Sequence, residues 1–455
     1  MTISKPEAAQ KTVDRVLNVL GNRSGSLPKE STAPAVAKSA THHQEFDFTA
    51  LPEYEILKIK RAVGDIVGLE NPFYRLHDGR AGATTSIAGR VVVNFSSYDY
   101  LGINGHPAVV AAALEAINTY GTSVSASRIS AGERQVHRDL ETALAQLHGV
   151  ADAVSFVGGH ATNVSVIGDL LGAEDLLVTD VAIHNSITEG AKLSGAKRIF
   201  CQHGDLDAME RALRLNRARC RRALIVVEGL YSMDGDVPDL AQLIKLKRRY
   251  NSWLMVDEAH SCGVLGASGR GIAEEQNIDP TEVDIWMGTL SKSFVAVGGY
   301  IAGSRPLIEL LRYTSPGFVF SVGQSPPLAA AALAAIKVMQ AEPWRLEKLR
   351  QNGRAFAAGA RRRGFDIGPT IGASVVPIIV GNSPHAVMLS QRLLARGYNV
   401  VPAIFPGVPE NQARLRFFIT SEHTLEQIEG ALDAVTEELA VLRNAPSLVS
   451  MVTQA

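Results

Sequence analysis

Residues 283–300 read VDIWMGTLSKSFVAVGGY and place one lysine shortly after an apolar run. The run Ile285–Met287 predicts a strand buried in a sheet, and Gly298 with Gly299 interrupts the pattern on the far side. Lys292 therefore lies at the mouth of a strand. Two interpretations are open: an ordinary exposed loop lysine, or a desolvated amine that forms an imine with a carbonyl cofactor.

The composition narrows the class of protein. A chain of 455 residues with 46% hydrophobic residues predicts a large globular domain and a second element. The net charge of −1 gives no electrostatic basis for binding nucleic acid. Cys201, Cys220 and Cys262 stand far apart, which predicts neither a metal site nor a disulfide framework. With no signal peptide at the N-terminus, we expect a cytoplasmic protein.

Between about residues 105 and 305, predicted helices alternate with apolar strands. This alternation predicts an α/β domain with a largely parallel sheet. The predicted helices span residues 107–119, 133–148, 162–171, 205–217 and 238–250. The predicted strands are Ala153–Val157, Leu176–Thr179, Arg198–Cys201, Ala223–Val227, Trp253–Val256, Ile285–Met287 and Tyr300–Ala302.

The whole chain divides into four predicted segments. These are a mobile N-terminal extension (1–45), a helix and strand segment (46–95), a large cofactor-binding domain (96–325) and a small α+β C-terminal domain (326–455). The last segment contains predicted helices at 326–340, 385–396 and 424–442, and predicted strands at Val375–Val380, Val400–Val401 and Leu415–Ile419.

The N-terminal extension has two interpretations. Residues 24–43 are rich in Ser, Ala, Pro and Lys, which is typical of a partly disordered tail. Apolar residues at helical spacing within residues 11–20 predict instead a short docking helix. Such a helix would suit an acyl carrier protein, or contact with the inner face of a membrane.

A carboxylate and a histidine follow the predicted strand Trp253–Val256. Ligands gather beyond the carboxyl ends of parallel strands, so we expect Asp257 to face the same crevice as Lys292. A carboxylate there keeps a pyridine nitrogen protonated, and His260 is placed to bond a phenolic oxygen. The alternative is that Asp257 caps the next helix and His260 is a surface residue.

A glycine pair precedes another predicted helix, in the stretch FVGGHATN at 156–163. Backbone N–H groups at a helix start hold phosphate, and the hydroxyl of Thr289 suits the same group. The alternative is a plain glycine turn. Upstream, His137 either stacks on a flat ring or lies on the surface. A strand-end aspartate, a glycine cradle and a loop lysine together predict pyridoxal phosphate.

Longer motifs extend this pattern over most of the chain. They are NFSSYDYLG, SRISAGERQVHRDLE, GGHATN, HNSITEGAKLSGA, EGLYSMDGD, DEAHSCGVLGASGRG, GTLSKSF, GGYIAG and VPENQARLR. From about Asn71 to Leu442 the chain resembles the α-oxoamine synthases, pyridoxal-phosphate acyltransferases of fold type I. The resemblance implies a mixed, mostly parallel seven-stranded sheet, a smaller C-terminal domain and a homodimer.

The resemblance also implies a role for each matched residue. Lys292 matches the lysine linked to the cofactor, Asp257 the partner of the ring nitrogen, and His260 the partner of the phenolic oxygen. The remaining matches are His137 stacking on the ring, Gly159, His160 and Thr289 at the phosphate, Ser186 near the phenolic oxygen, Ser321 at the phosphate of the neighbouring subunit, and Arg416 and Tyr98 at the substrate.

The resemblance implies a decarboxylating condensation of an amino acid with an acyl thioester carried by coenzyme A or a carrier protein. Tyr98 in SYDYLG is similar to serine palmitoyltransferases of sphingolipid biosynthesis, so serine and a long acyl chain are the first expectation. Some relatives have a second arginine at the position of Ile404. An uncharged residue there makes this chain more like the glycine-using ligases. Glycine or alanine is therefore the alternative; an aminotransferase and a non-catalytic partner subunit are rivals.

Overall fold

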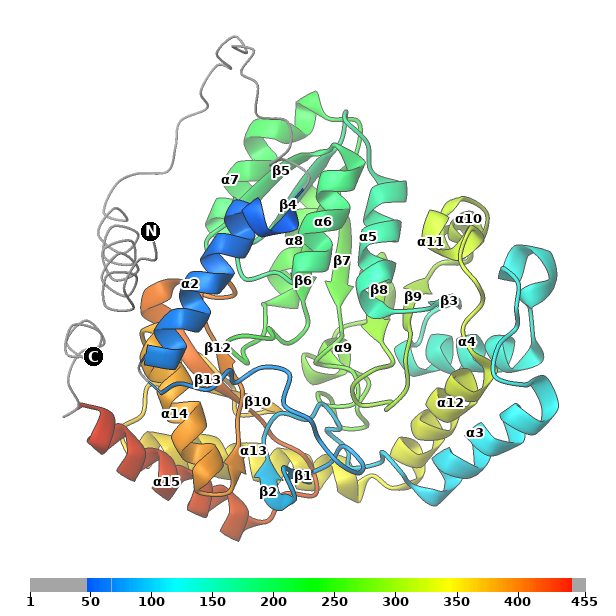
Figure 1. Cartoon of the computed structure of the whole chain (residues 1–455). Coiled ribbons are helices and arrows are strands. Elements are labelled where there is room, and N and C mark those ends of the chain that lie inside the picture. Colours follow the sequence, from blue (N-terminus) through cyan, green and yellow to red (C-terminus); the bar gives the residue numbers. More distant parts are fainter. Residues whose placement is uncertain (1–46, 67, 444–455) are drawn as a thin grey trace.

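The computed structural model describes residues 47–66 and 68–443. The predicted extension at 1–45, with its docking helix, lies outside these residues. Within them, a large α/β unit is flanked by a smaller unit that contains the C-terminal helices (Figure 1). No helix of the described part is long and apolar enough to cross a membrane.

A seven-stranded sheet forms the centre of the large unit, in the order β3-β9-β8-β7-β6-β4-β5. In this sheet β9 runs in the opposite direction to the other six strands, so the predicted mixed, mostly parallel sheet is confirmed. All seven predicted strands are present to within two residues. Their bounds are β3 Asp152–Phe156, β4 Leu176–Asp180, β5 Lys197–Cys201, β6 Ala223–Glu228, β7 Trp253–Asp257, β8 Ile285–Thr289 and β9 Gly299–Gly303.

Both faces of this sheet are buried, because successive side chains of a strand point to opposite faces. In β6, Ile225 and Val227 pack into one cluster and Leu224 and Val226 into the other. The first cluster is covered by α3 Pro107–Tyr120, α4 Gln135–His148, α7 Leu206–Asn216, α8 Leu240–Arg249 and α9 Ile272–Glu275. The second is covered by α5 Gly159–Leu170, α6 Asn185–Ser194, α10 Arg305–Thr314 and α11 Pro316–Val319. Sequence reasoning missed α6 and α10, and also the short helices α9 and α11.

The C-terminal part begins with α12 Pro326–Ala341, which packs against α3 and α4 (Figure 1). A three-stranded antiparallel sheet in the order β10-β13-β12 follows. The remaining bounds are α13 Trp344–Arg362, β10 Val375–Gly381, α14 Ser383–Ala395, β11 Tyr398–Asn399, β12 Pro402–Ala403, β13 Ala413–Phe418 and α15 Leu425–Arg443. The predicted strand at Val400–Val401 is wrong. These two residues connect β11 to β12, which belong to different sheets.

The segment before the large unit joins the C-terminal part. It contains α2 Pro52–Ile66, β1 Thr84–Ile87 and β2 Arg90–Asn94. β2 pairs antiparallel with β1 and parallel with β11, so a strand from near residue 90 and one from near residue 400 share a sheet. The four-segment division of the chain stays a prediction.

Candidate active site

Three neighbouring strands of the large sheet end in polar side chains. β6 ends at Glu228 and β7 at Asp257, and their last residues lie opposite each other in register. β8 runs parallel beside β7, and Lys292 lies three residues beyond its end. The carboxyl ends of parallel strands open at one edge of the sheet, so these three side chains gather there.

Lys292 lies half-buried in the turn that follows β8. Burial lowers the pKa of its ammonium group, the charge of Asp257, and that of Glu228 when it is ionised, oppose this shift, and Arg416 adds to it. In the same turn Val295 has φ of 44°, a strained conformation for a β-branched residue. The tight turn holds an amine that is readily deprotonated, as a nucleophile or base requires.

Asp257 and Glu228 have different surroundings although both are 3% exposed. The carboxylate of Asp257 accepts hydrogen bonds from Asn163 Nδ2 at 2.8 Å and from the Ala259 N–H at 2.9 Å. Glu228 accepts one from the Ser232 N–H at 3.0 Å, and its Oε1 has no partner among the described residues. Burial, then the charge of Asp257, raises the pKa of Glu228 to about 8. Glu228 is therefore protonated at neutral pH.

His260 lies between two tyrosines. Its Nδ1 is 2.7 Å from the hydroxyl of Tyr100, which is fully buried. The ring of Tyr98 stands edge-on to the imidazole, with centroids 6.1 Å apart, and Lys292 Nζ is 5.8 Å from the centre of the Tyr98 ring. Burial, followed by the charges of Lys292 and Arg416, holds the pKa of His260 well below its usual value. The imidazole is therefore neutral.

A small cradle lies where α5 begins. A side chain at Gly159 would place its Cβ 2.9 Å from Thr289 Oγ1, so glycine leaves the room that the threonine side chain needs. The Thr289 hydroxyl lies 2.8 Å from Ser291 Oγ. The backbone N–H groups at the start of α5 can donate hydrogen bonds to a phosphate, and so can the hydroxyls of Thr289 and Ser291. His160 is exposed beside the cradle, its Nε2 3.5 Å from Asn185 Oδ1.

Asn163 links the predicted Ser186 to Asp257. Its amide group donates one hydrogen bond to Ser186 Oγ at 2.9 Å and another to Asp257. Ser186, fully buried in α6, also lies 2.7 Å from His184 Nδ1. The network fixes the aspartate relative to α5 and α6.

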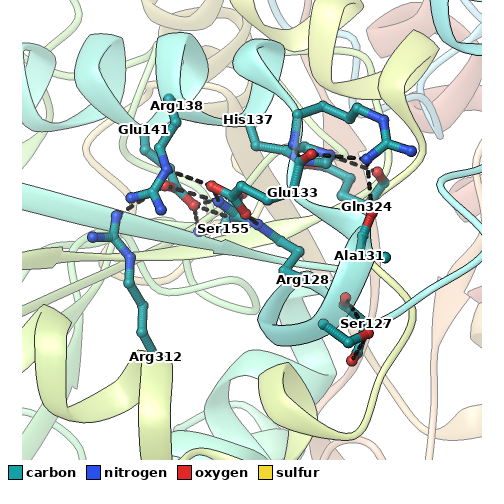
Figure 2. Close-up of polar contacts among 12 residues, drawn as sticks. Ser127, Arg128, Ala131, Glu133, His137, Arg138, Glu141, Ser155, Arg312 and Gln324 are labelled. Atoms are coloured by element: carbon teal, nitrogen blue, oxygen red, sulfur yellow. Dashed lines mark hydrogen bonds and ion pairs between the residues drawn. The ribbon is translucent and has the colours of Figure 1, made fainter.

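His137 is fully buried near the start of α4. Its Nε2 donates to the carbonyl oxygen of Gln324 at 2.8 Å, and burial lowers its pKa, so the ring is neutral. The π-helical turn η2 (Arg128–Gly132) just before α4 is anchored by Arg128, which bonds Glu133 and Glu141 (Figure 2). A neutral, rigid imidazole suits stacking on a flat ring.

Arg416 reaches the site from β13. Its Nη1 donates to the carbonyl oxygen of Ser232 at 2.9 Å, and its guanidinium lies 5.0 Å from the centre of the Phe418 ring. Within the described residues it forms no ion pair with a carboxylate. The structure does not bring Ser321 together with the other predicted site residues. No hydrogen bond or ion pair in the described part of the chain joins it to Lys292 or to the residues around Lys292. It lies in the segment between α11 and α12.

The residues present fit pyridoxal phosphate. Lys292 offers the amine for its aldehyde, Asp257 a carboxylate for its ring nitrogen, and the cradle at Gly159 room for its phosphate. Two buried polar atoms, Asn163 Oδ1 and Glu228 Oε1, have no partner among the described residues, as expected beside a polar ligand.

Sequence reasoning missed three residues of this site. Glu228 ends an apolar strand with a carboxylate, the same signal that identified Asp257, and could have been found by that rule. Asn163 lies one helical turn after Gly159, so the spacing alone places both at the start of α5. Tyr100 carries no local signal, because its partner His260 is 160 residues away.

Comparison with known proteins agrees with this geometry. Residues 90–435 match the family described as aminotransferase class I and II. The 8-amino-7-oxononanoate synthase of Symbiobacterium thermophilum is 40% identical over 348 residues, which cover 76% of this chain and 88% of that protein. The 8-amino-7-oxononanoate synthase 1 of Bacillus subtilis is 35% identical over 392 residues, 86% of this chain and 97% of that protein.

Solved structures agree as well. Serine palmitoyltransferase of Sphingomonas wittichii matches with a TM-score of 0.83 at 29% identity, covering 88% of this chain and 100% of that one. The cofactor is therefore pyridoxal phosphate, and the reaction is the decarboxylating condensation of an amino acid with an acyl thioester. Since these matches extend over most of its length, the chain belongs to the class I and II aminotransferase family and, within it, to the α-oxoamine synthases.

Proposed function

We propose that this enzyme joins a small amino acid, alanine before glycine, to an acyl thioester. The two relatives described above are named 8-amino-7-oxononanoate synthases, which favours the alternative over the first expectation of serine. Alanine and a seven-carbon acyl group give a nine-carbon chain with the amine on carbon 8 and the ketone on carbon 7, once one carbon leaves as CO2. The thiol leaves as the new carbon–carbon bond forms, and a proton replaces the lost carboxyl group.

Lys292 beside Arg416 is the observation that carries this proposal. Pyridoxal phosphate, when bound, supplies the aldehyde for the substrate amine and a ring that takes up the electron pair left on Cα. Lys292, with its lowered pKa, is the base that removes the Cα proton. Arg416, which holds no carboxylate of the described chain, binds the carboxylate of the amino acid through its guanidinium fork.

Serine with a long acyl chain is the second candidate, giving a 3-keto sphingoid base. The structural similarity to a serine palmitoyltransferase and Tyr98 in SYDYLG support it. Delivery of the acyl group by coenzyme A or by a carrier protein, and contact with a membrane, are linked to a predicted docking helix within residues 1–45, outside the described residues. Both stay predictions.

One assay separates these candidates. Release of thiol and CO2 is measured with alanine, glycine and serine, each paired with the coenzyme A thioesters of a seven-carbon dicarboxylic acid and of palmitic acid. The proposal expects the highest kcat/KM with alanine. Preference for serine and palmitoyl thioester would establish the second candidate. Keto acid formation without thiol release would show an aminotransferase and contradict both.

A further inference from the structure

Tyr100 and His260 form a buried pair beside the cofactor residues. The side chain of Tyr100 is 0% exposed and that of His260 6%, and 2.7 Å separates the tyrosine hydroxyl from His260 Nδ1. Tyr100 lies in a turn that Asp99 stabilises. The Asp99 carboxylate accepts hydrogen bonds from the backbone N–H groups of Ile103 and Asn104, at 2.9 Å each. The pair is thus rigid and shielded from water.

Counting protons shows which group donates. Burial raises the pKa of Tyr100 well above its usual value, so the phenol keeps its proton. His260 is neutral and carries one N–H. His260 Nδ1 is the only hydrogen-bond partner of the Tyr100 hydroxyl within the described residues. A buried hydroxyl proton needs an acceptor, so it points at Nδ1, and the imidazole proton must sit on Nε2.

Ser374 lies near enough to Tyr100 to influence its pKa. It is fully buried, and its Oγ has no hydrogen-bond partner in the described part of the chain. Ser374 therefore does not compete with His260 for the proton of Tyr100.

We propose that Tyr100 is a positioning residue that fixes His260 in the tautomer protonated on Nε2, so that Nε2–H donates to the phenolic oxygen of pyridoxal phosphate. In the other tautomer Nε2 would present a lone pair to that oxygen, and the contact would be repulsive. This inference deepens the proposed function, because it rests on the role of His260 at the cofactor.

The test reads the tautomer directly. The full-length protein is labelled with ¹⁵N in its histidines, and the ring nitrogens are observed by NMR with the cofactor removed and restored. The His260→Asn variant assigns the signal. We expect an unprotonated Nδ1 and a protonated Nε2 in both states. A proton on Nδ1 in the unmodified chain would overturn the inference, whatever the behaviour of any variant.

Tyr100→Phe removes the donor. We expect a mixture of His260 tautomers, a shifted absorption band of the bound cofactor, and pyridoxal phosphate affinity reduced roughly fivefold to tenfold, the net effect of one hydrogen bond. An unchanged His260 signal, or an unchanged affinity, would contradict the positioning role.

Tyr300→Phe is the matched control. Tyr300 is also 0% exposed, and its hydroxyl lies 2.8 Å from Nε2 of the buried His148, outside the site. This variant should lose comparable stability while leaving the His260 signals and the cofactor affinity unchanged. Because the tautomer is read without cofactor or substrate, failure of every condensation assay would overturn the proposed function and leave this inference standing.

Discussion

Lys292 and Glu228 have opposite charges when ionised. Both lie at the carboxyl ends of the parallel strands, where burial favours the neutral form of each. The pKa of the lysine is lowered and that of the glutamic acid is raised to about 8. Asp257, between them in the sheet, keeps two hydrogen-bond donors that stabilise a carboxylate. The ends of three neighbouring strands thus bring together a base (Lys292), a hydrogen-bonded carboxylate (Asp257) and a neutral carboxylic acid (Glu228).

Glu228→Gln tests the raised pKa. Between pH 4.5 and about 8 the folded chain keeps a proton that the unfolded chain has lost, so this group makes folding less favourable as pH rises. The variant lacks that penalty. Relative to the unmodified chain, its free energy of unfolding should therefore increase between pH 5 and pH 9, as measured by denaturant titration of the cofactor-free protein.

Glu274→Gln is the control for this experiment. Burial opposes the shift, but hydrogen bonds from the Ser268 hydroxyl and then from the Arg270 and Ser268 backbones lower the pKa of Glu274. Its contribution to stability is therefore lost only below pH 4.5. Its stability difference should stay constant from pH 5 to pH 9. Equal pH profiles for the two variants would refute the raised pKa of Glu228.

Lys292 should be the residue linked to the cofactor, since it is the lysine of the described part whose amine lies in the strand-end crevice with a lowered pKa. Borohydride reduction of the loaded enzyme followed by peptide mapping should find the pyridoxyl group on Lys292. The Lys292→Ala chain should remain unlabelled. A label on another lysine of the unmodified enzyme would show that the site is misassigned.

At the scale of elements, α4 and η2 are held by ion pairs in the protein interior. Glu141 accepts hydrogen bonds from Arg128, from Arg312 at 2.9 Å and from the Ser155 N–H at 2.8 Å (Figure 2). Glu141 and Arg128 are 2% and 5% exposed. These contacts join α4, η2, β3 and α10, and so hold His137 in its place.

Glu141→Gln should destabilise the protein strongly. The change leaves the buried guanidinium of Arg128 with too little compensating charge, and breaking such a pair costs about 3–5 kcal/mol. Arg138→Gln breaks an ion pair of the same network whose arginine side chain is 48% exposed, and should cost about 1 kcal/mol or less. The two free energies of unfolding are compared by urea titration, and equal losses would contradict the argument.

At the scale of the whole molecule, the segment around Ser321 presents apolar side chains to solvent. Phe320 is 85% exposed, Tyr313 69% and Val322 49%. Large exposed apolar side chains such as Phe320 and Val322, two residues apart, are typical of protein interfaces. With the matched position of Ser321, they support the predicted homodimer, in which Ser321 reaches the phosphate of the neighbouring subunit.

Phe320→Glu should convert the predicted dimer to monomers, because it would place a charge in the apolar interface proposed here, and should weaken pyridoxal phosphate binding with it. Sedimentation velocity and cofactor titration measure both effects. Leu215→Glu, at a 67% exposed position on α7, is the matched control and should change neither. A dimer that survives Phe320→Glu, or a monomer with full activity, would argue against the shared site.

The seven strands of the large sheet, the strand end that carries Asp257 and the turn that carries Lys292 were predicted from the sequence. Runs of apolar residues predict strands of a parallel sheet that is covered on both faces. A polar residue at the end of such a run can be recognised as a candidate site residue without knowing what it contacts. Longer motifs assigned the family and the cofactor.

Tertiary structure decided the rest. The pairing of β2 with β11, the hydrogen bond between Asn163 and Asp257, and that between Tyr100 and His260 join residues 94 to 305 positions apart. No local pattern encodes such a pair, because burial and hydrogen bonding act on whichever groups the packed chain brings together. The same packing raises the pKa of Glu228, since only the folded chain removes its carboxyl from water and sets it beside Asp257.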